Sequence, residues 1–152
     1  DASPASVVRR WLAQRRRARP EEAPPSEAAL RAAEALAGVG DPAGAPELRA
    51  AALDGRHPAE VRRRLIAALG RVKDRAAVPD LVRLLQDADL RIGVAHALGR
   101  IGDRRAIGPL VRQLRAEPHP PAREAEVEAL RALGHRRVDA LAAAYLGSAP
   151  RR

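Results

Sequence analysis

The sequence predicts an all-α fold, a right-handed α-solenoid of about four helix pairs with an N-terminal capping helix. The main observation is a phrase that occurs twice: residues 68–83 return nearly unchanged as residues 97–112, so that Leu69 recurs as Leu98, 29 residues later. Self-similarity at a period of this size is typical of stacked helical repeats. The apolar residues are mostly Ala, Leu, Val and Ile, which suits closely packed helices. Because a solenoid works through a long surface, we expect its function on a surface and not in a single pocket.

The 152 residues carry a net charge of +9, and Lys73 is the only lysine. An excess of arginine fits the recognition of carboxylates or phosphates, although a GC-rich coding sequence would produce the same bias. The lack of cysteine excludes disulfides, thiolate nucleophiles and cysteine-bound zinc. The sequence has no apolar run of about 18 residues that could span a membrane and no visible signal-peptide pattern. We expect a cytoplasmic protein.

Residues 1–19 are predicted to form a basic amphipathic helix. Ser3 is placed to cap it and Pro4 suits its first position. Its apolar stripe comprises Val7, Val8, Trp11 and Leu12. We expect this helix to cap the first repeat, with Trp11 buried against it. The alternative reading takes the arginine-rich segment Arg9–Arg19 as a basic arm for nucleic acid or an anionic membrane surface.

A proline-rich linker over residues 20–25 is expected to separate this helix from a repeat domain over residues 26–147, and residues 148–152 form a C-terminal tail. Each repeat is predicted to hold two helices. In the first helix, apolar residues recur every fourth position before the Leu-Gly step, and Gly70, Gly99 and Gly134 are expected to end it. The second helix begins near a proline and buries residues such as Leu81 and Leu110.

Three aspartates stand at matched positions between the two helices of a repeat. They are Asp41, Asp74 and Asp103. We expect each to cap the second helix and to pair with the arginines that recur in the first helix, Arg62 and Arg91. The fourth copy is degenerate: Leu133-Gly134 follows Leu98-Gly99 by 35 residues, which sets Glu126 at the place of Arg62 and Arg91.

The phrase Ala-Leu-Gly-Arg-Val/Ile-x-Asp-Arg-x-Ala, together with Val61-Arg62 and Leu90-Arg91, resembles the HEAT-like repeats named after phycobilisome lyases. The resemblance covers roughly Ser26 to Leu146. It implies that the second helices line a concave surface that holds partners. It also leaves open a bilin-lyase-like enzyme or enzyme subunit as an alternative function.

The residues do not indicate catalysis. The four histidines lie in different repeats or connections, and none has the spacing with glutamate that a zinc-hydrolase helix needs. The few serines lie outside the repeat body, and no glycine-rich phosphate loop is present. We therefore expect no enzyme activity, no metal and no cofactor.

The remaining signal is a set of arginines on the second helices and near the fourth repeat. Arg75 and Arg104 are equivalent, as are Arg83 and Arg112. The predicted partner-binding residues are Arg75, Arg83, Arg104, Arg112, Arg115 and Arg136. We expect a non-enzymatic scaffold or adaptor that presents a concave, arginine-rich surface to an acidic protein or peptide. A sequence-independent binder of the nucleic-acid backbone is the alternative, and a solvated face without a partner is the competing structural reading.

Overall fold

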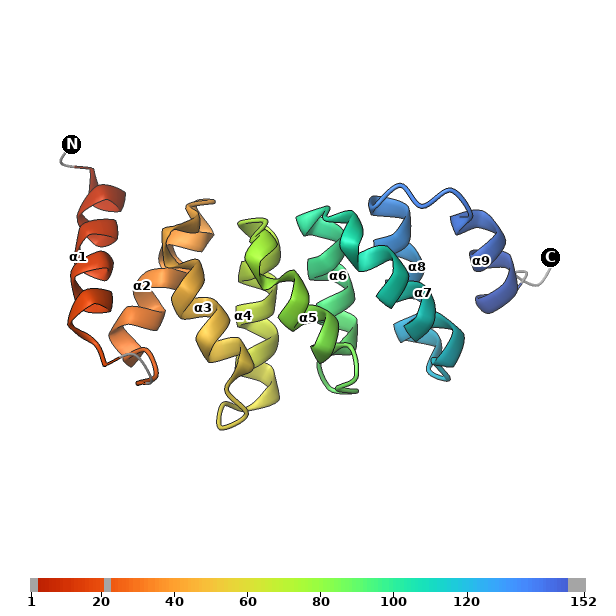
Figure 1. Ribbon diagram of the computed structural model, residues 1–152, viewed down its shortest axis with the longest axis horizontal. Helices are drawn as coiled ribbons and strands as arrows, with labels where there is room; N and C mark the ends of the chain where they lie inside the picture. The colour runs from red at the N-terminus through yellow and green to blue at the C-terminus, as the bar shows by residue number, and fades with distance from the viewer. Residues whose placement is uncertain (1–2, 21–22, 148–152) are drawn as a thin grey trace. The chain divides into compact units, whose positions relative to one another are not determined.

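The computed structural model describes residues 3–20 and 23–147 (Figure 1). The chain divides after Asp74 into two compact units, which are described one at a time. Throughout the described residues the regular elements are α-helices and short 3₁₀ turns. The predicted all-α fold class is confirmed, with the helix-turn-helix units of an α-solenoid.

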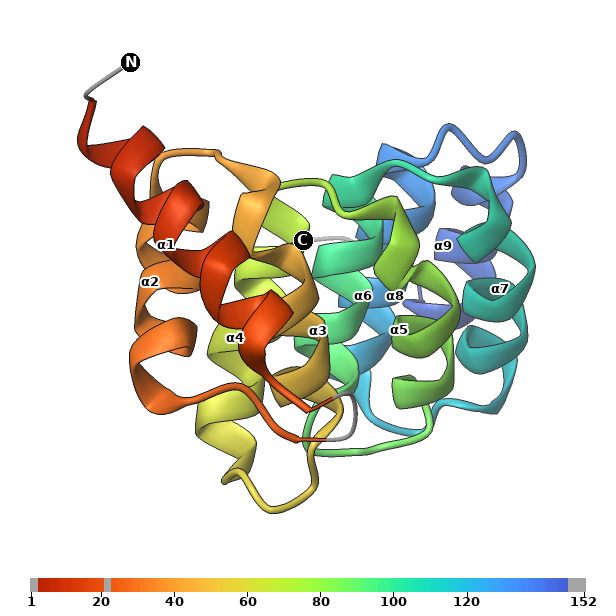
Figure 2. The same cartoon turned by 60° about the vertical axis from the view of Figure 1, so that its left-hand side comes forward.

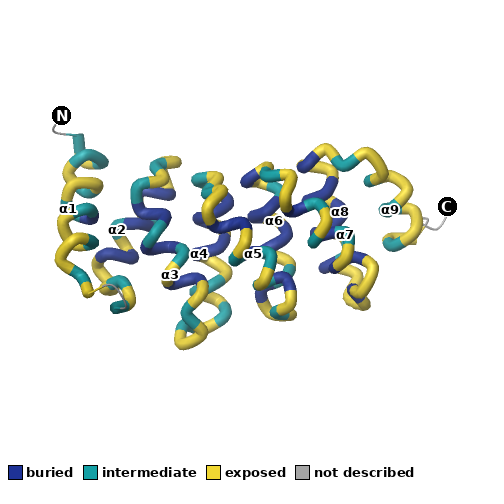
Figure 3. Tube along the Cα trace, viewed as in Figure 1, coloured by how far each residue is buried: buried dark blue, intermediate teal, exposed yellow. Residues whose placement is uncertain are grey.

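The first unit contains α1 (Pro4–Ala18), α2 (Glu27–Gly38), the 3₁₀ turn η1 (Pro42–Gly44), α3 (Ala45–Leu53) and α4 (Ala59–Arg71). Helix α2 packs against α3 and α4, and α3 also packs against α4. Helix α1 lies against α2 at the edge of this unit (Figure 2). The sides of α2, α3 and α4 that face one another hold the buried residues (Figure 3).

Helix α1 docks differently from the way its apolar stripe predicts. Leu12 is its buried residue, whereas Val7 is 52% exposed and Trp11 is only half-buried. The guanidinium carbon of Arg15 lies 5.0 Å from the centre of the Trp11 ring. Leu12, and not Trp11, is thus the residue that α1 buries fully, and the expected burial of Trp11 is met only in part. Ion pairs complete the contact, as Arg9 lies 3.2 Å from the Asp41 carboxylate.

The second unit contains η2 (Arg75–Ala77), α5 (Val78–Leu84), α6 (Arg91–Ile101), η3 (Arg104–Ala106), α7 (Ile107–Ala116), α8 (Pro120–Ala132) and α9 (Val138–Tyr145). Helices α6 and α8 pack extensively against each other. Helix α5 packs on α6, while α7 and α9 both pack on α8. The core of this unit is built from leucines and smaller residues, among them Leu98, Leu110 and Leu130.

A 3₁₀ turn precedes the second helix of the first three repeats, α3, α5 and α7. The carboxylate of Asp41 accepts the N–H of Ala43 at 3.0 Å, and that of Asp103 accepts the N–H of Arg105 at 3.0 Å. The turn uses the residues just before the proline, so each proline falls in the first helical turn. Pro46, Pro79 and Pro109 stand there in α3, α5 and α7. A proline is tolerated in that turn because its missing N–H would have no partner within the helix.

Of the three Leu-Gly glycines predicted to end the first helices, Gly134 follows the C-cap residue of α8 at φ 70°, whereas Gly70 and Gly99 do not end their helices. Gly70 and Gly99 lie inside α4 and α6, which continue to Arg71 and Ile101. The left-handed residue that ends a helix comes three positions later, as Gly102 at φ 75° does after Gly99. The requirement at Gly99 is close packing, since an added Cβ would lie 3.1 Å from the Cα of Ala129 on α8.

The fourth repeat follows a different register from the one its Leu-Gly dipeptide predicts. The N–H groups of Asp41 and Asp74 donate to the carbonyls five residues earlier, at Leu36 and Leu69, and the N–H of His135 donates in the same way to Leu130. Leu130, and not Leu133, is thus the counterpart of Leu98, and the spacing is 32 residues. Arg123 therefore takes the place of Arg62 and Arg91, and Glu126 takes the place of Val94.

Candidate partner-binding face

The six arginines predicted to bind a partner all lie in the second unit and are all exposed. Arg75 and Arg104 belong to the 3₁₀ turns η2 and η3, Arg83 to α5, Arg112 and Arg115 to α7, and Arg136 to the connection after α8. We call this set the arginine face. The structure brings these residues to the second helices and the turns before them, on elements that pack as one unit.

Three members of the arginine face are already engaged within the protein. Arg83 pairs with the carboxylate of Asp80, one helical turn away on α5. Arg104 donates to the carbonyl of Leu133 at 3.2 Å and so joins η3 to the end of α8. The hydrogen bonds from Arg105 are the main cause of the lowered pKa of Asp103, and the charge of Arg75 adds to their effect. The Arg104 contact joins two elements, whereas the Arg83 pair lies within one exposed turn of α5, so one of these three arginines has a structural role between elements.

The other three members are available to a partner. Throughout residues 3–20 and 23–147, no group forms a hydrogen bond or ion pair with the guanidinium of Arg112, Arg115 or Arg136. Arg112 and Arg115 are three residues apart on α7, which places them on the same side of the helix. A free guanidinium can donate two parallel hydrogen bonds to a carboxylate or phosphate.

A hollow of about 380 Å³ lies between α7 and α9, beside Arg115. The sequence reasoning missed it, because it depends on where α9 packs. Its lining is mostly apolar, its charged members are arginines, and it includes His135. The lining residues are Val111, Arg115, His135, Arg137, Ala140, Leu141, Ala144 and Tyr145. The signal in the sequence was the apolar composition of α9, in which Asp139 is the one charged residue.

A half-buried arginine brace links neighbouring helix pairs, and the predicted pairing of Arg62 and Arg91 with the aspartates is wrong. The Nε atoms of Arg62, Arg91 and Arg123 donate to the carbonyls of Ala52, Leu85 and Glu117, at 2.8, 2.6 and 2.5 Å. Each carbonyl stands at or just beyond the end of the preceding second helix.

The aspartates take other partners than Arg62 and Arg91. Asp74 lies 2.8 Å from Arg49, and Asp103 lies 2.8 Å from Arg105. The hydrogen bond from the Arg105 side chain, together with its backbone N–H, lowers the pKa of Asp103 to about 2.

The brace in the second unit carries a buried carboxylate pair that the sequence reasoning did not foresee. Glu117 is 2% exposed and lies 2.6 Å from Arg91. Burial opposes its ionisation, but the N–H of His119 and the guanidinium of Arg91 outweigh that effect and lower its pKa. Glu126 is fully buried, and neither of its carboxylate oxygens has a hydrogen-bond partner in the described protein. Burial, followed by the charge of Glu117, raises the pKa of Glu126 to about 7.

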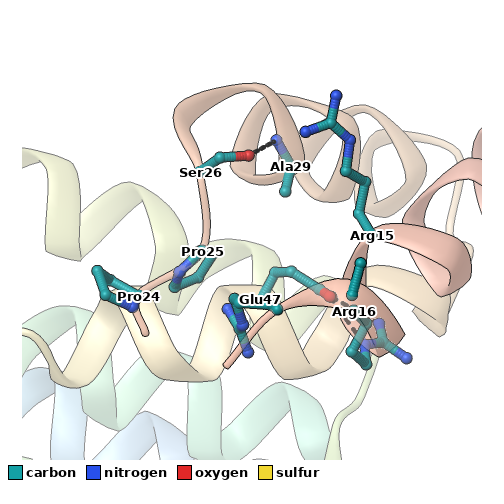
Figure 4. A pocket seen from close by; sticks show the side chains of 9 residues that line it. Arg15, Arg16, Pro24, Pro25, Ser26, Ala29 and Glu47 are labelled. Carbon is teal, nitrogen blue, oxygen red and sulfur yellow. Dashed lines mark hydrogen bonds and ion pairs between the residues drawn. The ribbon is translucent and has the colours of Figure 1, made fainter. Parts of the chain in front are cut away.

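A second hollow, of about 220 Å³, lies where α1 meets α2 in the first unit (Figure 4). Three of its polar groups, Arg16, Glu47 and Ser26, form hydrogen bonds within the unit. Arg16 donates to both carboxylate oxygens of Glu47, at 2.8 and 2.6 Å, and to the carbonyl of Ala43 at 2.9 Å. The hydroxyl of Ser26 accepts the N–H of Ala29 and so caps α2. Arg9 and Arg16 of the basic segment thus serve to dock α1.

The described residues hold no group of three or more histidine, cysteine or acidic side chains that could bind a metal ion. In the same part of the chain, every helix is too short or too polar to cross a membrane.

A family model described as HEAT repeats matches residues 50–131, which is more than half of the chain. The matched segment runs from α3 to α8. A search of the curated proteins finds no match.

Proposed function

This chain belongs to the HEAT-repeat family, and we propose that it is a non-enzymatic adaptor whose arginine face holds an acidic segment of a partner protein. Repeats of this family commonly serve as scaffolds for protein interactions. In the second unit, α5, α7 and the turns before the second helices carry exposed arginines, while the first helices α6 and α8, which expose Arg100 and Arg131, form the core contact. Because α6 and α8 pack on each other, the second helices α5 and α7 are the ones that can meet a partner.

The observation that carries the proposal is that the guanidinium groups of Arg112, Arg115 and Arg136 have no partner among the residues that the structure describes. In the same unit, Arg83 is paired with a carboxylate and Arg104 with a carbonyl. An arginine that supports the fold has a partner within the fold, so those without one are the best candidates for an external anion. Such contacts contribute most to the association rate and to specificity.

An acidic protein is a better match than a nucleic-acid backbone. The carboxylates of Asp80 and Asp103 lie among the arginines of the face and would repel a continuous row of phosphates. Bases of single strands stack on exposed aromatic rings. Tyr145 is half-buried, and Trp11, the other large aromatic residue, lies in the first unit. The carboxylates of a protein segment can be spaced irregularly, so each of them can meet a separate arginine.

The proposal is tested by fluorescence anisotropy with a labelled peptide of alternating Glu and Ser. The peptide should bind the intact chain at low salt, and the double variant Arg112→Glu/Arg115→Glu should weaken binding about tenfold or more. The control is Arg71→Glu/Arg100→Glu, which makes the same charge change at exposed arginines of the first helices α4 and α6. Equal loss in both double variants would show a general charge effect and contradict the proposal.

A labelled DNA duplex provides the second arm of this experiment. Micromolar binding to the duplex, with a steep decrease as salt rises, would favour the nucleic-acid alternative. The narrower likeness to phycobilisome-lyase repeats stays a prediction, which uptake of a bilin by the purified protein would test.

A further inference from the structure

We infer that the hollow between α7 and α9 is an anchor pocket for large apolar side chains of an acidic amphipathic helix. The inference rests on the proposed function and identifies the kind of acidic partner that the second unit holds. The hollow lies beside the arginine face, with Arg115 common to both. An apolar side chain could enter the hollow while neighbouring carboxylates meet the arginines.

Helix α9 leaves apolar residues uncovered that a partner could bury. Its sequence, Val-Asp-Ala-Leu-Ala-Ala-Ala-Tyr, is almost entirely apolar, yet none of its residues is buried. By contrast, α7 buries Leu110, Gln113 and Leu114. Helix α9 carries a single charged residue, Asp139, so the surface that it exposes is mostly apolar.

Few contacts hold α9 in place. Arg123 on α8 donates to the carbonyl of Tyr145 at 3.4 Å, and Arg131 lies 3.2 Å from Asp139. Both contacts lie on the α8 side, where α9 packs. The side of α9 toward α7 is left to form the wall of the hollow, through residues such as Leu141 and Ala144.

The size and lining of the hollow fit side chains such as leucine. Its volume of about 380 Å³ is near the lower end of the roughly 300–1,000 Å³ typical of ligand pockets. Val111, Leu141 and Tyr145 supply its larger apolar groups. Burial of one leucine side chain in such a site strengthens binding by about tenfold or more.

The charges around the hollow select an acidic occupant. Arg115, Arg137 and His135 are its ionisable groups apart from the half-buried phenol of Tyr145, and its lining contains no acidic residue. Arg112 and Arg115 are one turn apart on α7, a rise of about 4.5 Å. Glutamates one turn apart on a partner helix repeat at the same rise. A second copy of this chain is a poor occupant because each copy carries a net charge of +9.

The test compares two labelled peptides of equal length and charge. In the first, Leu recurs at positions i, i+3, i+4 and i+7 among Glu residues, and in the second each Leu is Ser. The Leu peptide should bind the intact chain at least tenfold more tightly. Ala144→Leu, which fills the hollow, should remove that advantage and leave binding of the Ser peptide unchanged. Ala143→Leu lies on the same helix but outside the lining, and should change neither affinity.

The outcomes separate the two proposals. If both peptides bind equally to the intact chain, the anchor pocket is wrong while the arginine face stands. If Ala143→Leu and Ala144→Leu weaken the Leu peptide to the same extent, the hollow is not the anchor. If neither peptide binds, both proposals fail. Self-association of the chain at the peptide-binding concentration, abolished by Ala144→Leu, would assign the hollow to a second copy and overturn the inference.

Discussion

The third and fourth repeats of the chain, α6–α7 and α8–α9, have the same backbone turns and arginine hydrogen bonds but bury different residues. Both begin with an arginine that donates to the end of the preceding helix pair, Arg91 in α6 and Arg123 in α8. Both end their first helix near a left-handed glycine, Gly102 at φ 75° and Gly134 at φ 70°. Yet the third repeat buries Val94 where the fourth buries Glu126.

The second helices of the two repeats also differ in burial, and again the fourth repeat buries fewer apolar residues. Helix α7 buries two leucines, whereas α9 buries no residue. The backbone turns and arginine braces therefore suffice to shape a repeat, and apolar burial decides how strongly it is held. The weakly held repeat is also the one that borders the proposed binding surface, which suits a region that gains its missing contacts from a partner.

Truncation of one leucine in each second helix should show the largest difference. Leu110→Ala in α7 should lower the free energy of unfolding by about 2–5 kcal/mol, because Leu110 is fully buried and its loss leaves a cavity. Leu141→Ala in α9 should cost less than about 1 kcal/mol, because Leu141 is only half-buried. Urea unfolding followed by circular dichroism measures both values. Equal losses would mean that α9 is as firmly packed as α7.

Replacement of the buried carboxylate should produce the next largest effect. Glu126→Leu should stabilise the protein by about 2–3 kcal/mol at pH 8, because it removes a carboxylate without partners from a site where Leu65 and Val94 stand in the earlier repeats. Glu128→Leu is the matched control, since Glu128 is exposed on the same helix. If both variants raise the free energy of unfolding equally, the increase comes from helix α8 in general and not from the buried site.

The same carboxylate should make stability depend on pH. The pKa of Glu126 is about 7 in the folded protein, above the ordinary value of 4.5. The folded state therefore holds a proton that the unfolded state releases, and stability is highest below pH 4.5 with respect to this group. As the pH rises from 4.5 to 7, this contribution falls by about 3 kcal/mol in total.

Glu126→Gln, which keeps the shape of the side chain, isolates this contribution. The difference in unfolding free energy between wild type and Glu126→Gln should change across the window from pH 4.5 to 7 and stay constant above about pH 8. The groups that act on Glu126 are Glu117, Arg91 and Arg123. Glu117, whose pKa is lowered, stays ionised across that window. A constant difference over the whole window would show that Glu126 is ionised in the folded protein.

The smallest effects should come from the turns that the two repeats share. Gly102→Ala and Gly134→Ala should each cost about 1 kcal/mol, since both glycines have a positive φ that a Cβ disfavours. Gly93→Ala, inside α6 with open space around the added Cβ, should instead stabilise by about 0.5–1 kcal/mol. Thermal unfolding reports all three. Unequal losses at Gly102 and Gly134 would show that the two turns do not share one role.

The repeat period was enough to predict the fold class, because the apolar positions of paired helices recur with it. The register of the fourth repeat was predicted wrongly because Leu133-Gly134 copies the dipeptide Leu98-Gly99, while the hydrogen bond from His135 to Leu130 sets the true frame. In that frame Glu126 falls at a core position, and the local sequence does not reveal this. The hollow was missed for a different reason, since it forms only where α9 packs beside α7.

The candidate site was predicted in part. All six arginines are exposed, as a binding surface requires. Sequence spacing could not separate Arg104, which donates to Leu133, from Arg112, which has no partner in the described protein, because the distinction depends on which carbonyl lies within reach of each guanidinium.

The most direct test of the central claim is an NMR titration of the ¹⁵N-labelled chain with the unlabelled Glu/Leu peptide. The account predicts that the largest shift changes occur at the backbone amides of Val111, Arg115 and Ala144, around the hollow beside the arginine face. The amides of α2, α3 and α4 should stay unchanged. Shift changes confined to those helices of the first unit, or none at a saturating peptide concentration, would contradict the account.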